Sequence, residues 1–138
     1  MAMSLTRAFN TDRDLEEQGK WFNDVLGDKS DVNLKVRRMS AEAVVKFQQD
    51  MVQQNRYRMK EGKFSEEVAN EILIETLAGA VLVDWNGVTD DEGITVPFSV
   101  DAARKYLTDL RDFRLLVSAL ANNMDAYRKG VEADISKN

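Results

Sequence analysis

The chain has 138 residues, with 24 acidic and 19 basic side chains and a formal net charge of −5. It contains neither cysteine nor histidine, which excludes thiolate and imidazole as metal ligands, nucleophiles or proton shuttles near neutral pH. A chain of this length with 43% hydrophobic residues is typical of one domain that buries its core without disulfides or metal, so we predict a single domain over residues 1–138.

The N-terminal part is compatible with a short helix, Ser4 to Phe9, followed by the acidic segment Asp12 to Glu17 and closed by Gly19. The first residues lack the long apolar core of a signal peptide, and no window of the chain approaches the ~18 apolar residues of a membrane span. We therefore expect a protein that stays in the cytoplasm of the cell that makes it and does not contact the membrane.

A β-hairpin is predicted over residues 20–37, with arms at 20–26 and 31–37. The apolar residues of the second arm follow the two-residue period of a half-buried strand: Val32, Leu34 and Val36. A lone hairpin is marginal in water, so its apolar face, with Trp21 or Phe22 on the first arm, must lie on helices or on another chain. The sequence favours packing within the domain and leaves strand addition by a partner open.

Two helices are predicted next. The first begins at Ser40 as N-cap and meets no breaker before Gly62. The second begins at Ser65 and includes residues 72–83, ILIETLAGAVLV, which are apolar on most sides and predict a central core helix. We expect Leu77 and Val81 to be among the most buried side chains, and a strand that begins near Val81 stays an alternative.

A connector follows at residues 83–99, VDWNGVTDDEGITVPFS, which contains the only proline of the chain. Trp85 and Phe98 are expected to anchor it to the core, and Ser99 to cap the next helix. The acidic residues superficially resemble a calcium loop. The register fails, because a loop that starts at Asp84 has non-matching residues at its fifth, sixth and twelfth positions, so we predict no metal site.

The C-terminal part predicts a short helix over residues 100–107 and a longer amphipathic helix over residues 113–131, with a frayed tail at 135–138. The fold class is therefore mainly α: a compact helical domain of four to five helices with a small N-terminal β-hairpin, in which residues 40–135 are helical. No recognisable catalytic motif is present, and we expect neither an enzyme nor a cofactor.

Charge is distributed in blocks. Residues 35–63 have a net charge of +5, whereas residues 64–99 contain no Lys or Arg and have a net charge of −8. The favoured interpretation is two neighbouring helices that neutralise each other, and the alternative is a homo-oligomer or an oppositely charged partner. Nucleic-acid binding is not expected, because the acidic chain lacks a large basic surface with interleaved aromatic residues.

The second half of the helix predicted over residues 40–62 is polar nearly all round and should bury little. This part of the chain and the basic residues before it are the candidate partner-binding region: Arg37, Arg38, Met51, Arg56, Tyr57, Arg58 and Met59. The competing interpretation is that the methionines belong to the core, which is the commoner role of methionine at helical spacing.

The order of these features resembles the tail assembly chaperones of long-tailed phages. The resemblance covers nearly the whole chain, and its most specific part is in the connector: Trp85, Gly87, Val88, Gly93, Pro97 and Phe98. It implies a non-catalytic assembly factor, here in the short form. Such a factor binds the tape measure protein, keeps it soluble, helps to recruit tail tube subunits and leaves before the virion is complete.

The resemblance also implies contact with the tail tube protein through a longer form made by ribosomal frameshifting, and a location in the cytoplasm of the bacterial host rather than in the mature virion. Two other classes of function stay open. A virion structural protein, such as a head–tail connector or a minor tail protein, would share the size and acidity of this chain. A small regulatory adaptor would form a defined complex with one partner.

Overall fold

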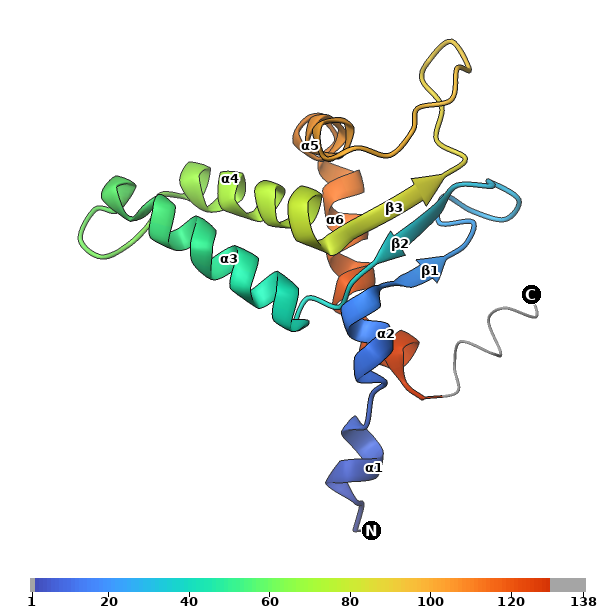
Figure 1. The fold of residues 1–138 in the computed structure, drawn as a ribbon, viewed down its shortest axis with the longest axis horizontal. Coiled ribbons are helices and arrows are strands. Elements are labelled where there is room, and N and C mark those ends of the chain that lie inside the picture. Colours follow the sequence, from blue (N-terminus) through green and yellow to red (C-terminus); the bar gives the residue numbers. More distant parts are fainter. Residues whose placement is uncertain (1, 130–138) are drawn as a thin grey trace.

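The computed structural model describes residues 2–129, in which helices pack on one side of a small antiparallel sheet (Figure 1). The helices are α1 (Leu5–Phe9), α2 (Arg13–Gln18), α3 (Glu42–Gln54), α4 (Glu66–Thr76), α5 (Val100–Asp109) and α6 (Arg111–Ala121). The strands are β1 (Lys20–Phe22), β2 (Asn33–Val36) and β3 (Leu82–Asn86). Three shorter turns of helix are Arg56–Arg58, Leu77–Val81 and Met124–Tyr127. The predicted helix-rich fold with an N-terminal hairpin is thus confirmed, with a sheet larger than expected.

The sheet has the order β1-β2-β3, and both pairs are antiparallel. The hairpin prediction is correct for β1 and β2, although residues 23–32 form a longer loop than the sequence indicated. The third strand corrects the favoured prediction of one helix through residue 83 and agrees with the alternative of a strand that begins near Val81. A π-helical turn, Leu77–Val81, ends α4, and Leu82 then takes extended backbone angles and opens β3. Because β3 pairs with β2, the predicted hairpin is not alone and its second arm is the central strand.

Helices α3 and α4 form a helical hairpin that projects from the sheet (Figure 1). Helix α3 is shorter than predicted, because the Asn55 side chain donates to the carbonyl of Met51 and the chain then turns into the 3₁₀ segment Arg56–Arg58. Ser40 is not its N-cap. The backbone N–H of Glu42 instead donates to the carboxylate of Glu17 on α2, at 2.6 Å, so a side chain from another helix caps α3.

The caps of α4 and α5 are as predicted. Ser65 accepts a hydrogen bond from the backbone N–H of Val68, and Ser99 accepts one from Ala102. Leu77 and Val81 are fully buried in the core beneath the sheet and the helices, which confirms the expectation for both. The turn that holds them lies close to α3, since a Cβ added to Gly79 would come within 2.6 Å of the Phe47 ring.

The last described segment also differs from its prediction. Helix α6 ends at Ala121 instead of continuing to Val131, because the Asn122 side chain donates to the carbonyl of Ser118 and a 3₁₀ turn follows. This turn buries Tyr127, whose hydroxyl donates to the carbonyl of Val36 at 2.7 Å. Position 131 and the predicted tail at 135–138 lie outside the described residues.

Candidate functional site

Part of the predicted partner-binding region lies at the far end of the α3–α4 hairpin. We call this end the basic tip, and it consists of Arg56, Tyr57, Arg58, Lys60 and Lys63. Tyr57 is 84% exposed, and the Arg56 side chain is exposed beside it. Arg58, Lys60 and Lys63 border a pocket of about 360 Å³ whose floor includes Phe64 and Val68. The tip therefore presents positive charge around one accessible aromatic ring.

One ion pair joins the basic tip to α4. The guanidinium of Arg58 donates to the carboxylate of Glu71 at 2.5 Å. This hydrogen bond lowers the pKa of Glu71 from its ordinary value of 4.5 and raises the pKa of Arg58. Among the described residues, no ion pair engages Arg56, Lys60 or Lys63. Among the described residues, one ion pair thus joins the two charge blocks of the sequence, and the other basic side chains of the tip can form ion pairs with a partner.

The two predicted methionines lie along this hairpin and are half-buried. Met51 borders a second cavity of about 360 Å³, between α3, α4 and α5, together with Ile72 and Arg104. The guanidinium of Arg104 forms two hydrogen bonds to Glu75, at 2.7 and 3.0 Å, which close one side of this cavity. Met59 follows the 3₁₀ segment that carries Tyr57. The methionines therefore combine partial packing with partial exposure.

Arg37 and Arg38 are not part of the basic tip. Arg37 donates from Nε to the carbonyl of Glu17, at 2.7 Å, and from Nη1 to the carbonyl of Ala80, at 3.0 Å. Arg38 forms an ion pair with Glu16, at 3.1 Å, and lies over the Tyr127 ring. Both arginines fasten α2 to the rest of the molecule, so the structure divides the seven candidate residues into two groups at opposite ends of α3.

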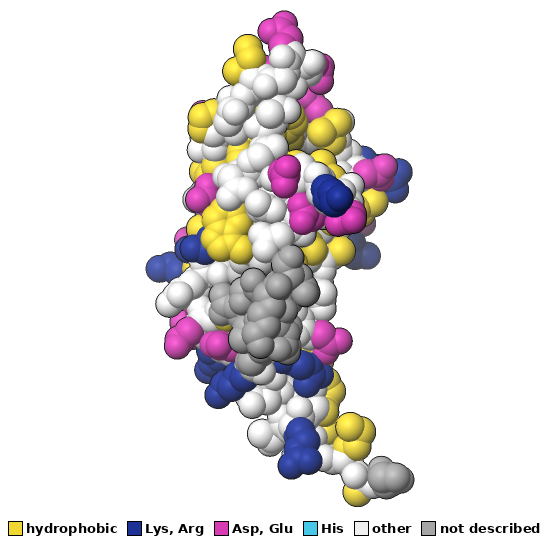
Figure 2. All heavy atoms as spheres, turned by 90° about the vertical axis from the view of Figure 1, so that its right-hand side faces the viewer, with side chains coloured by type: hydrophobic (Ala, Val, Ile, Leu, Met, Phe, Trp, Pro, Cys, Tyr) yellow, Lys and Arg dark blue, Asp and Glu magenta, His cyan; other side chains and the backbone are white. Residues whose placement is uncertain are grey.

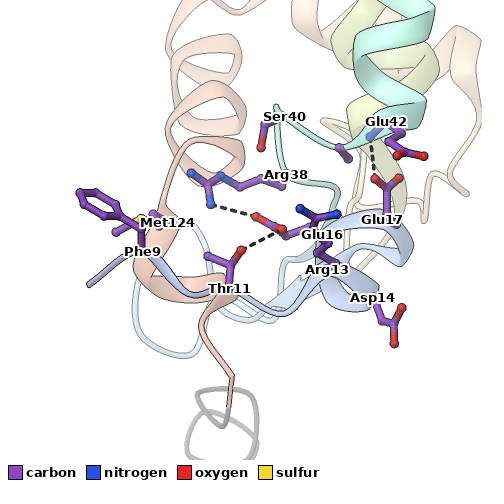
Figure 3. A pocket seen from close by; sticks show the side chains of 11 residues that line it. Phe9, Thr11, Arg13, Asp14, Glu16, Glu17, Arg38, Ser40, Glu42 and Met124 are labelled. Carbon is purple, nitrogen blue, oxygen red and sulfur yellow. Dashed lines mark hydrogen bonds and ion pairs between the residues drawn. The ribbon is translucent and has the colours of Figure 1, made fainter. Parts of the chain in front are cut away.

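A polar cavity of about 560 Å³ surrounds Arg38 at the start of α3 (Figure 3). Glu16 points into it and accepts hydrogen bonds from Thr11 and Arg38. Glu17 lies below the first residues of α3 and caps that helix. Both carboxylates already have hydrogen-bond partners within the fold. We therefore interpret this cavity as a consequence of the attachment of α2 to α3 and not as a binding site.

The connector is anchored as predicted. Trp85 is 4% exposed, donates from its indole N–H to the carbonyl of Val96, at 2.8 Å, and meets Phe98 and Tyr106 edge to face. Gly87 has a φ of +77°, and a Cβ at this position would overlap the carbonyl of Asp31.

The turn that follows depends on one carboxylate. Asp90 accepts two backbone hydrogen bonds, from Glu92 and Ile94, and Gly93 takes a positive φ of +81° within the same turn. Val88 is half-buried. Pro97 is exposed, and Phe98, which follows it, is half-buried. The connector residues named by the resemblance thus shape an ordered loop.

Sequence reasoning missed one feature beside this connector, which we call the apolar groove. It has a volume of about 240 Å³ and is lined by Leu26, Val32, Trp85, Val88, Thr89, Tyr106, Leu110 and Phe113. Four separate parts of the chain contribute to it, so no local pattern could reveal it. The available signals were two isolated leucines: Leu26 at the end of the first predicted hairpin arm, and Leu110 between two predicted helices.

One comparison with known proteins identifies the family. A family model described as YdaY prophage protein matches residues 30–138. The chain belongs to the YdaY prophage protein family. Comparisons with curated proteins and with solved structures find no match.

The matched part of this YdaY-family protein extends from the end of the β1–β2 loop through both helical pairs. It includes the basic tip and every residue of the apolar groove except Leu26. Over residues 2–129, no group of three Asp or Glu side chains is arranged to hold a metal ion. No helix in the same part of the chain is both long and apolar enough to cross a bilayer.

Proposed function

We propose that this YdaY-family protein is a tail assembly chaperone, which binds the tape measure protein, keeps it soluble and helps to recruit tail tube subunits. It acts without catalysis in the bacterial cytoplasm and does not remain in the mature virion. The family supports the phage or prophage context. The observation that supports a binding role most directly is the 84% exposure of Tyr57 beside the exposed Arg56, at the end of a projecting helical hairpin.

An aromatic side chain in this position is suited to contact a client helix. Tyrosine and arginine are enriched among the residues that contribute most to protein interfaces, because both combine apolar surface with hydrogen bonding. Arg56 and Tyr57 are the contact residues that we propose, with Met51 and Met59 as adjustable apolar neighbours. Arg37 and Arg38 are left out of this contact surface, because their guanidinium groups already bind within the fold.

A single contact of this size would bind the client weakly, whereas many such contacts along one client would bind it effectively. One exposed tyrosine and one or two cations bury far less than the ~1,200–2,000 Å² of a stable interface. A long helical client offers many equivalent segments, so several copies bound along it would keep its apolar surface covered, while each copy could still dissociate. This behaviour is what a factor needs if tube subunits are to replace it.

The test is co-expression with the largest open reading frame just downstream, as the tape measure candidate, followed by fractionation into soluble and insoluble protein. We expect the candidate to be soluble only with this chain and to co-purify with it. The double variant Arg56→Glu with Tyr57→Ser should lose both effects. A control at the other end of α3, Val45→Ser with Lys46→Glu, also replaces an exposed side chain by serine and reverses one positive charge, and should behave as the wild type.

Three results would contradict the proposal. Solubility of the candidate that does not depend on this chain would remove the chaperone role. Retention of the chain in purified particles would instead favour a virion structural protein. A stable complex with one other partner, without any effect on tail assembly, would favour a regulatory adaptor.

A further inference from the structure

Large apolar side chains at the apolar groove are exposed to solvent. Leu26 is 65% and Leu110 is 49% exposed, although both border a groove whose other walls include buried Trp85. Ile94 and Leu115 belong to the neighbouring loop and helix and are also more than half exposed. Several large apolar side chains gathered in one region of a surface mark an interaction site more often than single ones do.

The charge around this groove has one dominant sign. The two loops that supply its walls are acidic: residues 23–32 have a net charge of −2, and residues 84–95 have a net charge of −4. Among the described residues, no ion pair engages a carboxylate of either loop. Figure 2 shows yellow hydrophobic and magenta acidic side chains, with fewer dark blue basic ones, over the upper part of the face that it draws. We call the carboxylates of these two loops the acidic rim: Asp24, Asp28, Asp31, Asp84, Asp90, Asp91 and Glu92.

The groove offers a partner little hydrogen bonding. Only Thr89 and Tyr106 bring polar side-chain groups that are not already committed, because the indole N–H of Trp85 donates to Val96. An extended segment bound here would leave many of its backbone groups without partners. A helix satisfies its own backbone and presents apolar side chains at a spacing of three and four residues, so it is the element that suits an apolar groove.

From these observations we propose that the apolar groove binds an amphipathic helix of a partner protein, whose apolar stripe is bordered by Lys and Arg. The apolar stripe covers Leu26 and Leu110, and the basic borders face the acidic rim. Complementary charge of this kind fixes the orientation of a helix in its groove and speeds its association. This inference concerns a surface distinct from the basic tip and does not depend on the tail assembly role.

The test uses a designed peptide of about 18 residues, or five helical turns, with leucines at helical spacing and lysines on both borders of the stripe. A second peptide has the same leucines and glutamates in place of the lysines. Binding to the full chain is measured by fluorescence anisotropy and mapped by amide and indole NMR shifts. We expect saturable binding of the basic peptide, at least about tenfold tighter than that of the acidic one, with the largest shifts at Trp85 and Leu110.

Variants separate groove binding from general attraction between a basic peptide and an acidic protein. Leu26→Ser with Leu110→Ser should weaken binding about tenfold or more, and both positions are exposed enough to keep the fold. The matched control, Leu5→Ser with Val45→Ser, also removes two exposed apolar side chains and should leave affinity unchanged.

A second pair of variants tests the acidic rim. Asp91→Asn with Glu92→Gln should reduce affinity and its salt dependence, whereas Asp50→Asn with Glu67→Gln changes net charge equally and should not. Equal affinity for both peptides, shifts confined to the basic tip, or equal losses in variant and control would each overturn the proposal. Concentration-dependent self-association that buries Leu110 would also overturn it, because the occupant would then be a second copy of this chain.

Discussion

The α3–α4 hairpin and the sheet region are built in opposite ways. In the hairpin, two helices that follow each other in sequence pack together, and their far end carries exposed polar and charged residues. In the sheet region, β1, β2, β3, the connector and α5 converge around Trp85 from segments up to about 90 residues apart. The hairpin end can thus change its surface without disturbing the fold, whereas the sheet region ties its apolar groove to the core.

This difference separates two kinds of binding surface on one molecule. The basic tip is reached from solvent on several sides and has few buried neighbours, which suits weak and replaceable contacts. The apolar groove is built on buried Trp85 and on four half-buried side chains, Val32, Val88, Tyr106 and Phe113, so much of the cost of ordering it has already been met in folding. Substitutions that affect the two regions unequally test this comparison directly.

The largest effect is expected for Trp85→Ala. It removes a buried indole with two aromatic neighbours and leaves the carbonyl of Val96 without its donor, which should cost about 3–5 kcal/mol in the free energy of unfolding. Tyr57→Ala at the basic tip should change this free energy by no more than about 0.5 kcal/mol. Urea unfolding followed by circular dichroism measures both. Similar losses for the two variants would show that the hairpin end is not independent of the core.

Two glycines sharpen the comparison, because both have a positive φ in different surroundings. Gly62, in the hairpin loop, has nothing within 4 Å of an added Cβ, whereas Gly87 lies against the backbone of Asp31. Gly62→Ala should therefore cost about 1 kcal/mol from backbone strain alone. Gly87→Ala adds a steric overlap and should cost about 2–4 kcal/mol. The same unfolding measurement applies, and equal costs would mean that the Asp31 loop yields easily.

The local parts of the fold were predictable from sequence. The caps at Ser65 and Ser99, the strand alternation in β2 and the burial of Leu77 and Val81 each depend on signals within a few residues. The third strand was not predictable in the same way. The apolar run 72–83 fits a buried helix or a strand equally well, and what decides between them is pairing with β2, about 50 residues earlier.

Long-range contacts also explain the other errors. Ser40 has the right chemistry for an N-cap, but Glu17 from α2 occupies that position. The apolar spacing from Phe113 to Val131 continues through Asn122, where the helix ends. The sequence could propose a candidate surface where its residues are local, at the basic tip, but not where four segments combine, at the apolar groove. The sequence alone could not show that Arg37 and Arg38 bind inside the fold.

A smaller effect is expected at Tyr127, which joins the C-terminal turn to the sheet. Tyr127→Phe removes the donor to the Val36 carbonyl and should cost about 1–3 kcal/mol near neutral pH. Burial raises the pKa of Tyr127 above its ordinary value of 10.0. The unfolded chain therefore loses this proton first as the pH rises through about 10, and the advantage of the wild type over the Phe variant should shrink there. Urea unfolding at several alkaline pH values measures this difference, and a constant difference would contradict the buried phenol.

The smallest effect concerns the one ion pair of the basic tip, and it tests whether that tip is electrostatically independent. Arg58→Gln should raise the pKa of Glu71 back toward its ordinary value of 4.5, because the hydrogen bond that lowers it is lost. Carboxyl NMR titration measures this pKa, and Arg56→Gln is the control that should leave it unchanged.

The same ion pair makes stability depend on pH. Since the pKa of Glu71 is lowered in the folded state, the pair stabilises the protein at pH values above the ordinary pKa of 4.5, and this contribution is lost as the pH falls through the lowered pKa. Both side chains are open to solvent, so the effect on unfolding should be slight and should decrease further with added salt. A large loss of stability in Arg58→Gln would instead make the tip part of the fold, and would restrict the proposed client contact to Arg56 and Tyr57.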